Sequence, residues 1–167
     1  MKNASINIHI DYQEEFLSTG KDKVTIYIAT NLGEDEKELS KIASGGEMSR
    51  IMLAIKTVLA DTDKMPILVF DEIDTGISGK AANSVAEKLS KIAKVHQVLC
   101  ISHLPNIAAI ADYNYFISKN VKNDRTNTNI KLLEEQEVIN EIARISSGEI
   151  NEATLKYAYE LRNKKAS

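Results

Sequence analysis

The chain has 167 residues, an apolar fraction of 43%, a charged fraction of 27% and a formal net charge of −3, which are the values of an ordinary soluble globular domain. The slight acidic balance does not indicate a protein that coats nucleic acid, because that class has a basic excess. No apolar run has membrane-spanning length and the start of the chain holds no signal-like block, so we expect a cytoplasmic protein with no membrane partner. Cys100, the single cysteine, lies in an apolar run and is predicted to be a buried, reduced thiol.

The first part of the chain alternates between two strand patterns and two polar stretches. Residues 5–10 and 24–29 alternate polar and apolar side chains, which predicts two half-buried strands. The polar stretch 11–23 between them, with Gly20 near its end, is predicted to be a turn or loop. The acidic stretch 31–39 is predicted to be a second loop.

The middle of the chain changes to helical periodicity. Apolar side chains recur at helical spacing from residue 47 to residue 59, which predicts an amphipathic helix directly after Ser44-Gly45-Gly46. The apolar runs 67–70 and 97–101 predict strands covered on both faces, as in a parallel sheet, and 80–93 is a second amphipathic helix between them. Alternation of strand and helix predicts an α/β domain with a mainly parallel core.

The last third of the chain is predicted to mix strands and helices. A short helix is expected at 105–111, after Pro105. Strands are expected at 113–118 and 128–133 around a polar turn. Two helices, 137–145 and 152–161, are expected to be separated by Ser146-Ser147-Gly148.

Two adjacent carboxylates, Asp71 and Glu72, follow the apolar run 67–70. Ligands of open parallel sheets bind beyond the carboxyl ends of strands, so both acids are predicted to emerge at a binding site. Successive side chains of an extended segment point in opposite directions, which allows the two acids different functions. One acid is suited to Mg²⁺, usually through water, and the other to orienting or deprotonating an attacking water. An acidic turn after a core strand is the structural alternative.

Two further patterns have a chemical and a purely structural interpretation. Gly45 and Gly46 leave main-chain N–H groups open to an oxygen ligand at the start of a helix, with Ser44 as a hydroxyl donor. The alternative is a helix start that Ser44 or Ser49 caps. His103 follows the second apolar strand and is suited to bind a phosphate oxygen or the lytic water, or it simply caps the end of that strand.

The order and spacing of these patterns connect them to a known class. The serine-glycine-glycine helix comes first, then the strand that ends in Asp71-Glu72, then Asp74-Thr75-Gly76-Ile77-Ser78-Gly79, and finally a helix and a strand that ends before His103. This is the order of the signature motif, Walker B, D-loop and H-loop of ABC-type ATPases. Ser78 stands where transporter-type ABC proteins usually carry an aspartate, whereas the Thr-Gly-Ile-Ser run is shared with RecN-like proteins.

Residues 41–112 closely resemble the RecN family of DNA-repair ATPases. The resemblance extends to Glu141-Ile142-Ala143-Arg144 and to Ser147-Gly148-Glu149-Ile150. It implies a P-loop NTPase fold of the ABC/SMC head type, of which residues 1–167 are the C-terminal lobe. That lobe comprises strands and a loop that lead in (1–40), the motif region (41–112) and terminal strands and helices (113–167).

The resemblance also implies functions for individual residues. Asp71 would support Mg²⁺, Glu72 would be the catalytic base, and His103 would contact the γ-phosphate of ATP. Ser78 would belong to the D-loop at the interface between two heads. The residues that would clasp the γ-phosphate of a nucleotide held by the opposite head are Ser44, Gly45, Gly46 and Glu47.

No Gly-x-x-x-x-Gly-Lys-Ser/Thr phosphate loop occurs in the sequence. The nearest candidate, Gly76-Ile77-Ser78-Gly79-Lys80-Ala81, has the wrong glycine spacing and no hydroxyl after the lysine. Without that loop nothing cradles the β-phosphate. We therefore expect a lobe that is inactive alone and whose partners are the N-terminal half of the same head, a second head and DNA, with the family's coiled coil ending before Met1.

Three other interpretations remain open from the sequence. In the first, the chain is part of the head of another SMC-like chromosome-maintenance ATPase. In the second, it is a binding module in which Asp71, Glu72 and the glycines are only structural. In the third, it is a hydrolase built on Ser44, His103 and an aspartate, although the sequence lacks the Gly-x-Ser-x-Gly elbow of such enzymes.

Overall fold

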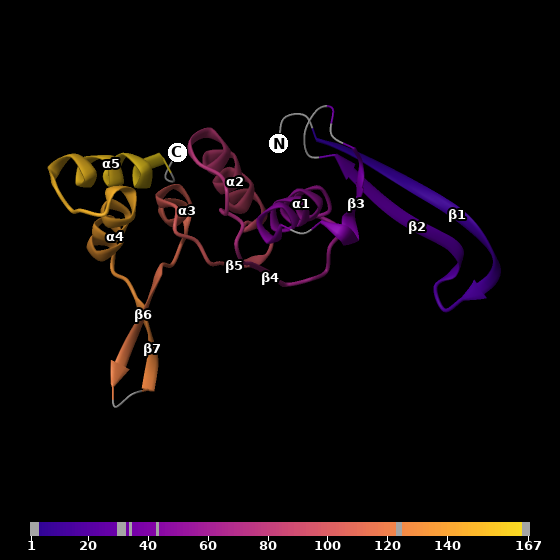
Figure 1. The fold of residues 1–167 in the computed structure, drawn as a ribbon. Helices are drawn as coiled ribbons and strands as arrows, with labels where there is room; N and C mark the ends of the chain where they lie inside the picture. Colours follow the sequence, from indigo (N-terminus) through magenta and orange to yellow (C-terminus); the bar gives the residue numbers. More distant parts are fainter. Residues whose placement is uncertain (1–3, 30–32, 34, 43, 123–124, 165–167) are drawn as a thin grey trace.

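The computed structural model describes residues 4–29, 33, 35–42, 44–122 and 125–164. Two hairpin arms extend from a body made of helices and one pair of parallel strands (Figure 1). The elements, in chain order, are β1 (Ser5–Leu17), β2 (Gly20–Ala29), β3 (Lys37–Glu38), a 3-10 turn (Leu39–Lys41), α1 (Gly45–Val58), β4 (Ile67–Phe70), α2 (Gly79–Ile92), β5 (Gln97–Cys100), α3 (Pro105–Ile110), β6 (Tyr115–Lys122), β7 (Arg125–Leu132), α4 (Glu135–Ser147) and α5 (Glu152–Asn163).

The first arm is a long antiparallel hairpin of β1 and β2. The strands pair from Ser5 with Ala29 to Leu17 with Gly20, with one irregularity after Tyr12. The loop predicted for residues 11–23 is therefore wrong, because polar residues continue both strands up to a tight turn. The burial predicted for residues 5–10 is also wrong, since their apolar side chains are more than half exposed. No described element covers this face of the hairpin.

The loop predicted for residues 31–39 lies partly outside the described residues. Its last part is not a loop, because β3 pairs with β2 through Tyr27 and Glu38. The first arm is therefore a three-stranded antiparallel sheet in the order β1-β2-β3.

The mainly parallel sheet that the sequence predicted is absent from the described residues. They form three small sheets, of which only β4–β5 is parallel. A parallel pair needs a crossover connection such as α2, whereas only two residues separate β1 from β2 and β6 from β7, which forces antiparallel pairing. The fold is therefore a mixed α/β architecture.

The described residues cover the parallel pair on one face. Leu68 and Phe70 of β4 are buried, whereas Ile67 and Val69 are 49% and 65% exposed. The buried face packs on α1, α2 and α3 through a core that includes Leu53, Leu89 and Ile107. The sequence predicted two covered faces, because an unbroken apolar run does not reveal which elements cover it.

The helices agree with the sequence pattern to within a few residues. Apolar periodicity predicted α2 at 80–93, and its expected core residues Val85, Leu89 and Ile92 are buried. In α1 the buried residues are Gly46, Ile51 and Leu53, so of the predicted apolar stripe only Ile51 is buried.

A second core joins the end of the chain to the body. Ala109 of α3, Ile142 of α4 and Ala158 of α5 are buried in it. Arg162 of α5 donates from Nη1 to the main-chain oxygens of Ala109 and Ala111 at 2.8 and 2.7 Å, so it satisfies carbonyls at the end of α3. The α4–α5 pair therefore holds α3 and the segment that follows β5.

Candidate functional site

The signature-like turn is the N-terminus of α1. Ser44 is its N-cap, and its hydroxyl accepts a hydrogen bond from the main-chain N–H of Glu47 at 3.4 Å. The helix begins at Gly45, two residues before the predicted start. The capping function that the sequence left open for Ser44 is therefore present in the structure.

The two glycines of this turn lie against Glu72 of the same chain. A Cβ on Gly45 would lie 2.3 Å from Oε2 of Glu72, and a Cβ on Gly46 would lie 2.9 Å from the main-chain oxygen of Glu72. Real Cβ atoms essentially never approach so closely, so glycine permits this contact. Two motifs that are separate in the sequence thus meet at one place.

Asp71 and Glu72 form an exposed turn directly after β4. Oδ1 of Asp71 accepts the main-chain N–H of Glu72 at 2.9 Å. Glu72 has a φ of 56°, and among the described residues it is the sole residue other than glycine with a positive φ. Such a conformation costs about 1–3 kcal/mol and concentrates at functional sites. Both carboxylates remain open to solvent.

The segment after Glu72 is fixed by α1. The hydroxyl of Ser49 donates to the main-chain oxygen of Asp71 at 2.7 Å. Nη1 of Arg50 donates to the main-chain oxygens of Ile73 and Thr75, at 3.2 and 2.8 Å. Sequence reasoning assigned no function to Ser49 or Arg50 beyond a possible cap, although both stand in the motif that begins at Ser44.

Asp74 joins the D-loop-like segment to the segment that carries His103. Its carboxylate is 3% exposed. Oδ2 accepts the Ser102 hydroxyl at 2.6 Å and the His103 main-chain N–H at 2.8 Å, and Nδ1 of the His103 ring lies 3.0 Å from the same oxygen. Neither Asp74 nor Ser102 was singled out from the sequence, because no local pattern marks a contact between segments so far apart.

The remaining predicted residues are exposed. Ser78 is the N-cap of α2 without a side-chain capping bond, between Gly76 and Gly79, whose φ values are 73° and 53°. The His103 side chain is 74% exposed. Since Ser44 caps α1 and His103 pairs with Asp74, no described hydrogen bond joins them as a serine hydrolase would require.

The fit of Mg²⁺ depends on Asp71. In the described part of the chain no group of three or more His, Cys, Asp or Glu residues is arranged to hold a metal ion. A single exposed carboxylate at the end of a strand fits Mg²⁺ that is bound largely through water and phosphate oxygens. His9 and His96 have their own contacts elsewhere. His9 lies in β1 against the ring of Tyr27, and His96 is buried with Nδ1 2.7 Å from the main-chain oxygen of Met65.

Cys100 lies under this region at the end of β5. Burial raises the pKa of its thiol to about 12, and the negative charges of Asp74 and Asp71 add to the effect. The thiol is therefore held protonated. Cys100, the single cysteine of the sequence, is free in the structure, and its predicted burial is only partial.

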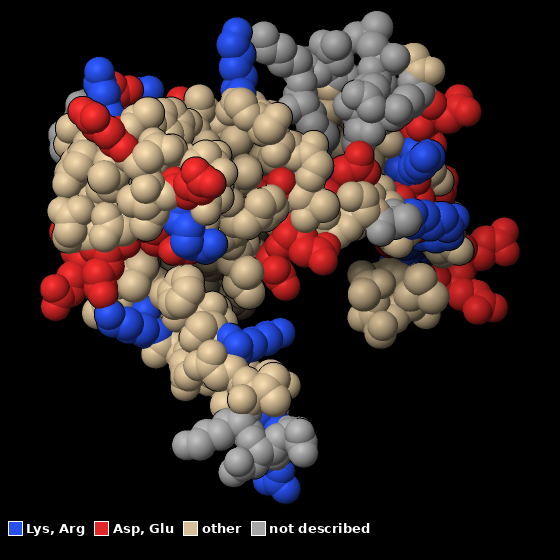
Figure 2. Space-filling model, turned by 60° about the vertical axis from the view of Figure 1, so that its left-hand side comes forward, with Lys and Arg blue, Asp and Glu red and all other residues tan. Residues whose placement is uncertain are grey.

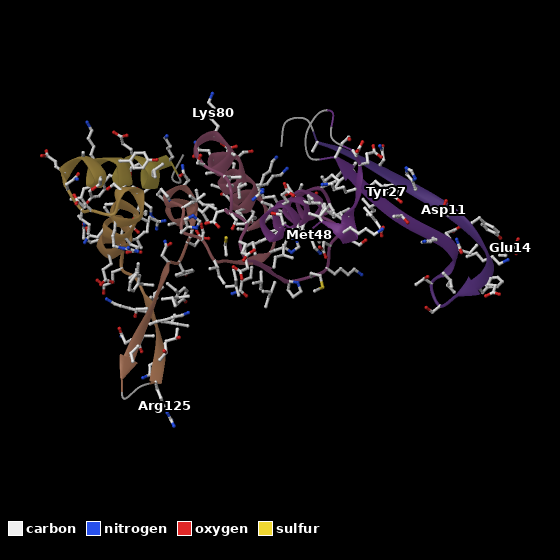
Figure 3. All side chains as sticks on the ribbon, viewed as in Figure 1. Asp11, Glu14, Tyr27, Met48, Lys80 and Arg125 are labelled. Atoms are coloured by element: carbon white, nitrogen blue, oxygen red, sulfur yellow. The ribbon has the colours of Figure 1, made fainter. Side chains whose placement is uncertain are left out.

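The β6–β7 hairpin has a polar, basic face. Residues 125, 127, 129 and 131 alternate with apolar and threonine positions along β7, so Arg125, Asn127, Asn129 and Lys131 share one face. Blue atoms without red ones mark this projecting arm below the body (Figure 2). The Arg125 side chain extends beyond the outer end of this hairpin, and Glu14 lies on the outer part of the other arm (Figure 3). The described residues of this hairpin include no Asp or Glu.

Comparisons with known proteins identify relatives of the chain. No protein-family model matches it. It is 48% identical over 143 residues to the DNA repair protein RecN of Bacillus subtilis (strain 168), across 85% of this chain and 25% of the relative. This chain is homologous to part of RecN. The RecN proteins of Deinococcus radiodurans and Vibrio cholerae are 44% and 39% identical, each across 96% of the chain. The chain spans about a quarter of the length of these RecN relatives.

Solved structures share the fold of this RecN homologue. The Smc head domain of Pyrococcus yayanosii matches with a TM-score of 0.61 at 19% identity, across 87% of this chain and 26% of that chain. The head of Pyrococcus furiosus Smc bound to ScpA matches with a TM-score of 0.55. A third match comes from a study of ATP-driven dimerization and DNA-stimulated activation of SMC ATPases. Its TM-score is 0.51 at 20% identity, across 89% of this chain and 84% of that chain. The fold is therefore that of an SMC-type head. No helix in the described ranges is long and apolar enough to span a membrane.

Proposed function

We propose that the chain is the C-terminal lobe of a RecN-type ATPase head, which hydrolyses ATP when it is joined to an N-terminal half that carries the phosphate loop. One observation carries this proposal: α1 and the segment before α3 both hydrogen-bond to the stretch that follows β4, α1 to the main-chain oxygens of Asp71 and Ile73 and His103 to the carboxylate of Asp74. If the motifs at Ser44 and His103 were only local caps, α1 and the segment before α3 would not both need to bond to the stretch after β4.

The proposed chemistry assigns a separate function to each carboxylate. Mg²⁺ with ATP, when bound, neutralises charge on the phosphate oxygens. Asp71 would hold this ion through water. Glu72 would accept the proton of the attacking water, and its strained main chain at φ 56° supports a functional rather than a structural residue. His103, whose exposed ring contacts Asp74, would hydrogen-bond the γ-phosphate.

The signature turn would serve a second head. Ser44, Gly45, Gly46 and Glu47 surround the N-terminus of α1, where main-chain N–H groups and the helix dipole favour an anion. We propose that this turn contacts the γ-phosphate of a nucleotide bound by the opposite head and that Ser78 approaches the same interface. The match to an SMC structure described with ATP-driven dimerization supports paired heads.

Uncovered apolar surfaces support an N-terminal half as partner. Ile67 and Val69 on β4, and Leu99 on β5, are about half exposed or more on one face of the parallel pair. Water-exposed apolar faces of this kind normally mark an interface. DNA is the third proposed partner, supported by the names of the relatives and by the basic face of β7. A cytoplasmic location associated with DNA follows from this assignment.

Another SMC-like ATPase remains the second candidate within the same chemistry. The identity to RecN, 39–48%, against 19–21% to the Smc heads favours the RecN assignment.

The decisive experiment uses the complete protein and the variant Glu72→Gln. Glutamine retains shape but takes no proton, so we expect ATP binding to persist while turnover falls by about 10²–10⁴-fold. The control is Glu160→Gln, an exposed position on α5, for which we expect normal turnover. Near-normal turnover by Glu72→Gln would refute the assignment.

A further inference from the structure

Asp74 is a buried carboxylate with an unusual concentration of donors. It is 3% exposed, and Oδ2 alone receives the Ser102 hydroxyl at 2.6 Å and the His103 N–H at 2.8 Å. The ring nitrogen Nδ1 of His103 lies 3.0 Å from the same oxygen. The sole ion-pair partner that the described residues offer this carboxylate is therefore the His103 ring.

A buried charge is costly unless donors compensate it. Arg50 fixes the main chain on both sides of Asp74, because its guanidinium donates to the main-chain oxygens of Ile73 and Thr75, the two neighbours of Asp74. Asparagine or serine would accept hydrogen bonds from Ser102 and His103 without a buried charge. These two hydrogen bonds alone therefore do not explain why an aspartate stands here.

The contact with Asp74 bears on the tautomer of the His103 ring. A carboxylate accepts hydrogen bonds, so a hydrogen on Nδ1, which lies 3.0 Å from Oδ2, would face an acceptor. In the neutral ring, Nε2 then has a free lone pair, and in the charged ring Nε2 carries a second hydrogen. Because the His103 side chain is 74% exposed, the Asp74 contact fixes one edge of the ring while the side chain remains accessible.

We propose that Asp74 is a positioning residue that acts through His103. It keeps the ring in the Nδ1–H form and directs Nε2 toward the ligand site beside Glu72. The proposal rests on the proposed function, since it assumes that His103 contacts the phosphate. The same carboxylate binds the main chain at His103, so orientation of the ring and position of the segment are set together.

The first test reads the ring directly and requires no nucleotide. The chain contains three histidines, so ¹⁵N-histidine labelling gives three ring systems, and His103→Ala identifies the relevant one. We expect long-range ¹H–¹⁵N correlations of neutral His103 to show the hydrogen on Nδ1. A hydrogen on Nε2, or rapid exchange between both forms, would overturn the proposal.

The second test is a double-mutant cycle in the complete protein. We expect Asp74→Asn to lower kcat for ATP hydrolysis by about 10–100-fold, which is the usual effect of losing a group that orients a functional histidine, with little change in KM. In a His103→Ala background the same substitution should cost less than roughly 3-fold, because residues that act as a unit are not additive. Equal losses in both backgrounds, or no loss in the wild-type background, would reject a function through His103.

Ser102→Ala is the matched control. It removes a donor to the same oxygen but leaves the ring contact, so we expect a smaller loss of kcat that persists in the His103→Ala background. If Ser102→Ala lowered kcat as much as Asp74→Asn does, and the loss again disappeared in the His103→Ala background, Asp74 would position the loop rather than the ring. Thermal melting checks folding, and if Asp74→Asn does not fold, the ring measurement decides. If Glu72→Gln or His103→Ala retains full turnover, the proposed ATPase function fails, whereas the ring measurement still tests the contact.

Discussion

A Cβ atom on Gly46 would lie 2.9 Å from the main-chain oxygen of Glu72, and 3.0 Å from the Cβ of Thr75. The first turn of α1 is therefore in direct contact with the main chain that carries the proposed catalytic base. Any side chain on Gly46 must move that main chain or the helix.

Overpacking usually costs about 1–3 kcal/mol, against a gain in helix propensity of at most about 1 kcal/mol. We therefore expect Gly46→Ala to lower the free energy of unfolding by up to about 2 kcal/mol. Urea unfolding followed by circular dichroism measures the difference. Gly45→Ala is the control, because its Cβ would meet only the carboxylate end of Glu72, which is able to rotate away. A stabilised Gly46→Ala, or a larger loss in Gly45→Ala, would contradict the packing described.

We expect the chain by itself to show no measurable ATPase activity. The physical reason is that it has no phosphate loop to hold the β-phosphate and no lysine of that loop to neutralise the transferred group. A phosphate-release assay on the purified chain, with Glu72→Gln beside it, tests this. Turnover that follows the protein through purification and disappears in Glu72→Gln would show the expectation to be wrong.

We expect Ser44→Arg in the complete protein to spare nucleotide binding and to prevent ATP-dependent pairing of heads. Arginine would fill the space in front of α1 where the opposite γ-phosphate is proposed to lie. If Ser44 only caps α1, the substitution instead lowers stability by about 0.5–2 kcal/mol and leaves pairing intact.

The measurement for Ser44→Arg is light scattering with and without ATP, in a Glu72→Gln background that retains the nucleotide. Glu72→Gln alone is the reference. An ATP-dependent dimer as tight as this reference would exclude the proposed contact across the interface.

We expect the Cys100 thiol to react very slowly in the folded chain. Its pKa is raised from 9.0 to about 12, so at pH 8 thiolate is about 10³-fold scarcer than in the unfolded chain, and alkylation by iodoacetamide should slow accordingly. The same chain in urea is the control. Equal rates in both states would contradict the raised pKa.

The same shift determines a pH dependence of stability. Above about pH 9 the unfolded chain loses the Cys100 proton while the folded chain retains it, so the unfolded state binds fewer protons. The contribution of Cys100 to the free energy of unfolding therefore falls as the pH rises from 9.0 toward about 12. Cys100→Ser, compared with the unsubstituted chain at pH 8 and pH 10, should have a shallower decline.

Local pattern in the sequence determined most of the helices and both parallel strands. The periodicity of Val85, Leu89 and Ile92 predicted the buried face of α2, because side chains three and four residues apart share one face of a helix. The sequence also indicated a candidate site before any contact was known. Its signals were Gly45 and Gly46 before one helix and Asp71 and Glu72 after one strand.

Tertiary structure alone decided which faces are covered and which distant groups meet. Ile67 and Val69 belong to an apolar run that predicts full burial, yet they are exposed, since burial depends on elements elsewhere in space. The contact between Asp74 and Ser102 joins residues 28 positions apart. Hydrophobic spacing reports on neighbours within a few residues, whereas a carboxylate finds its donors only after β4 and β5 have paired and brought their carboxyl ends together.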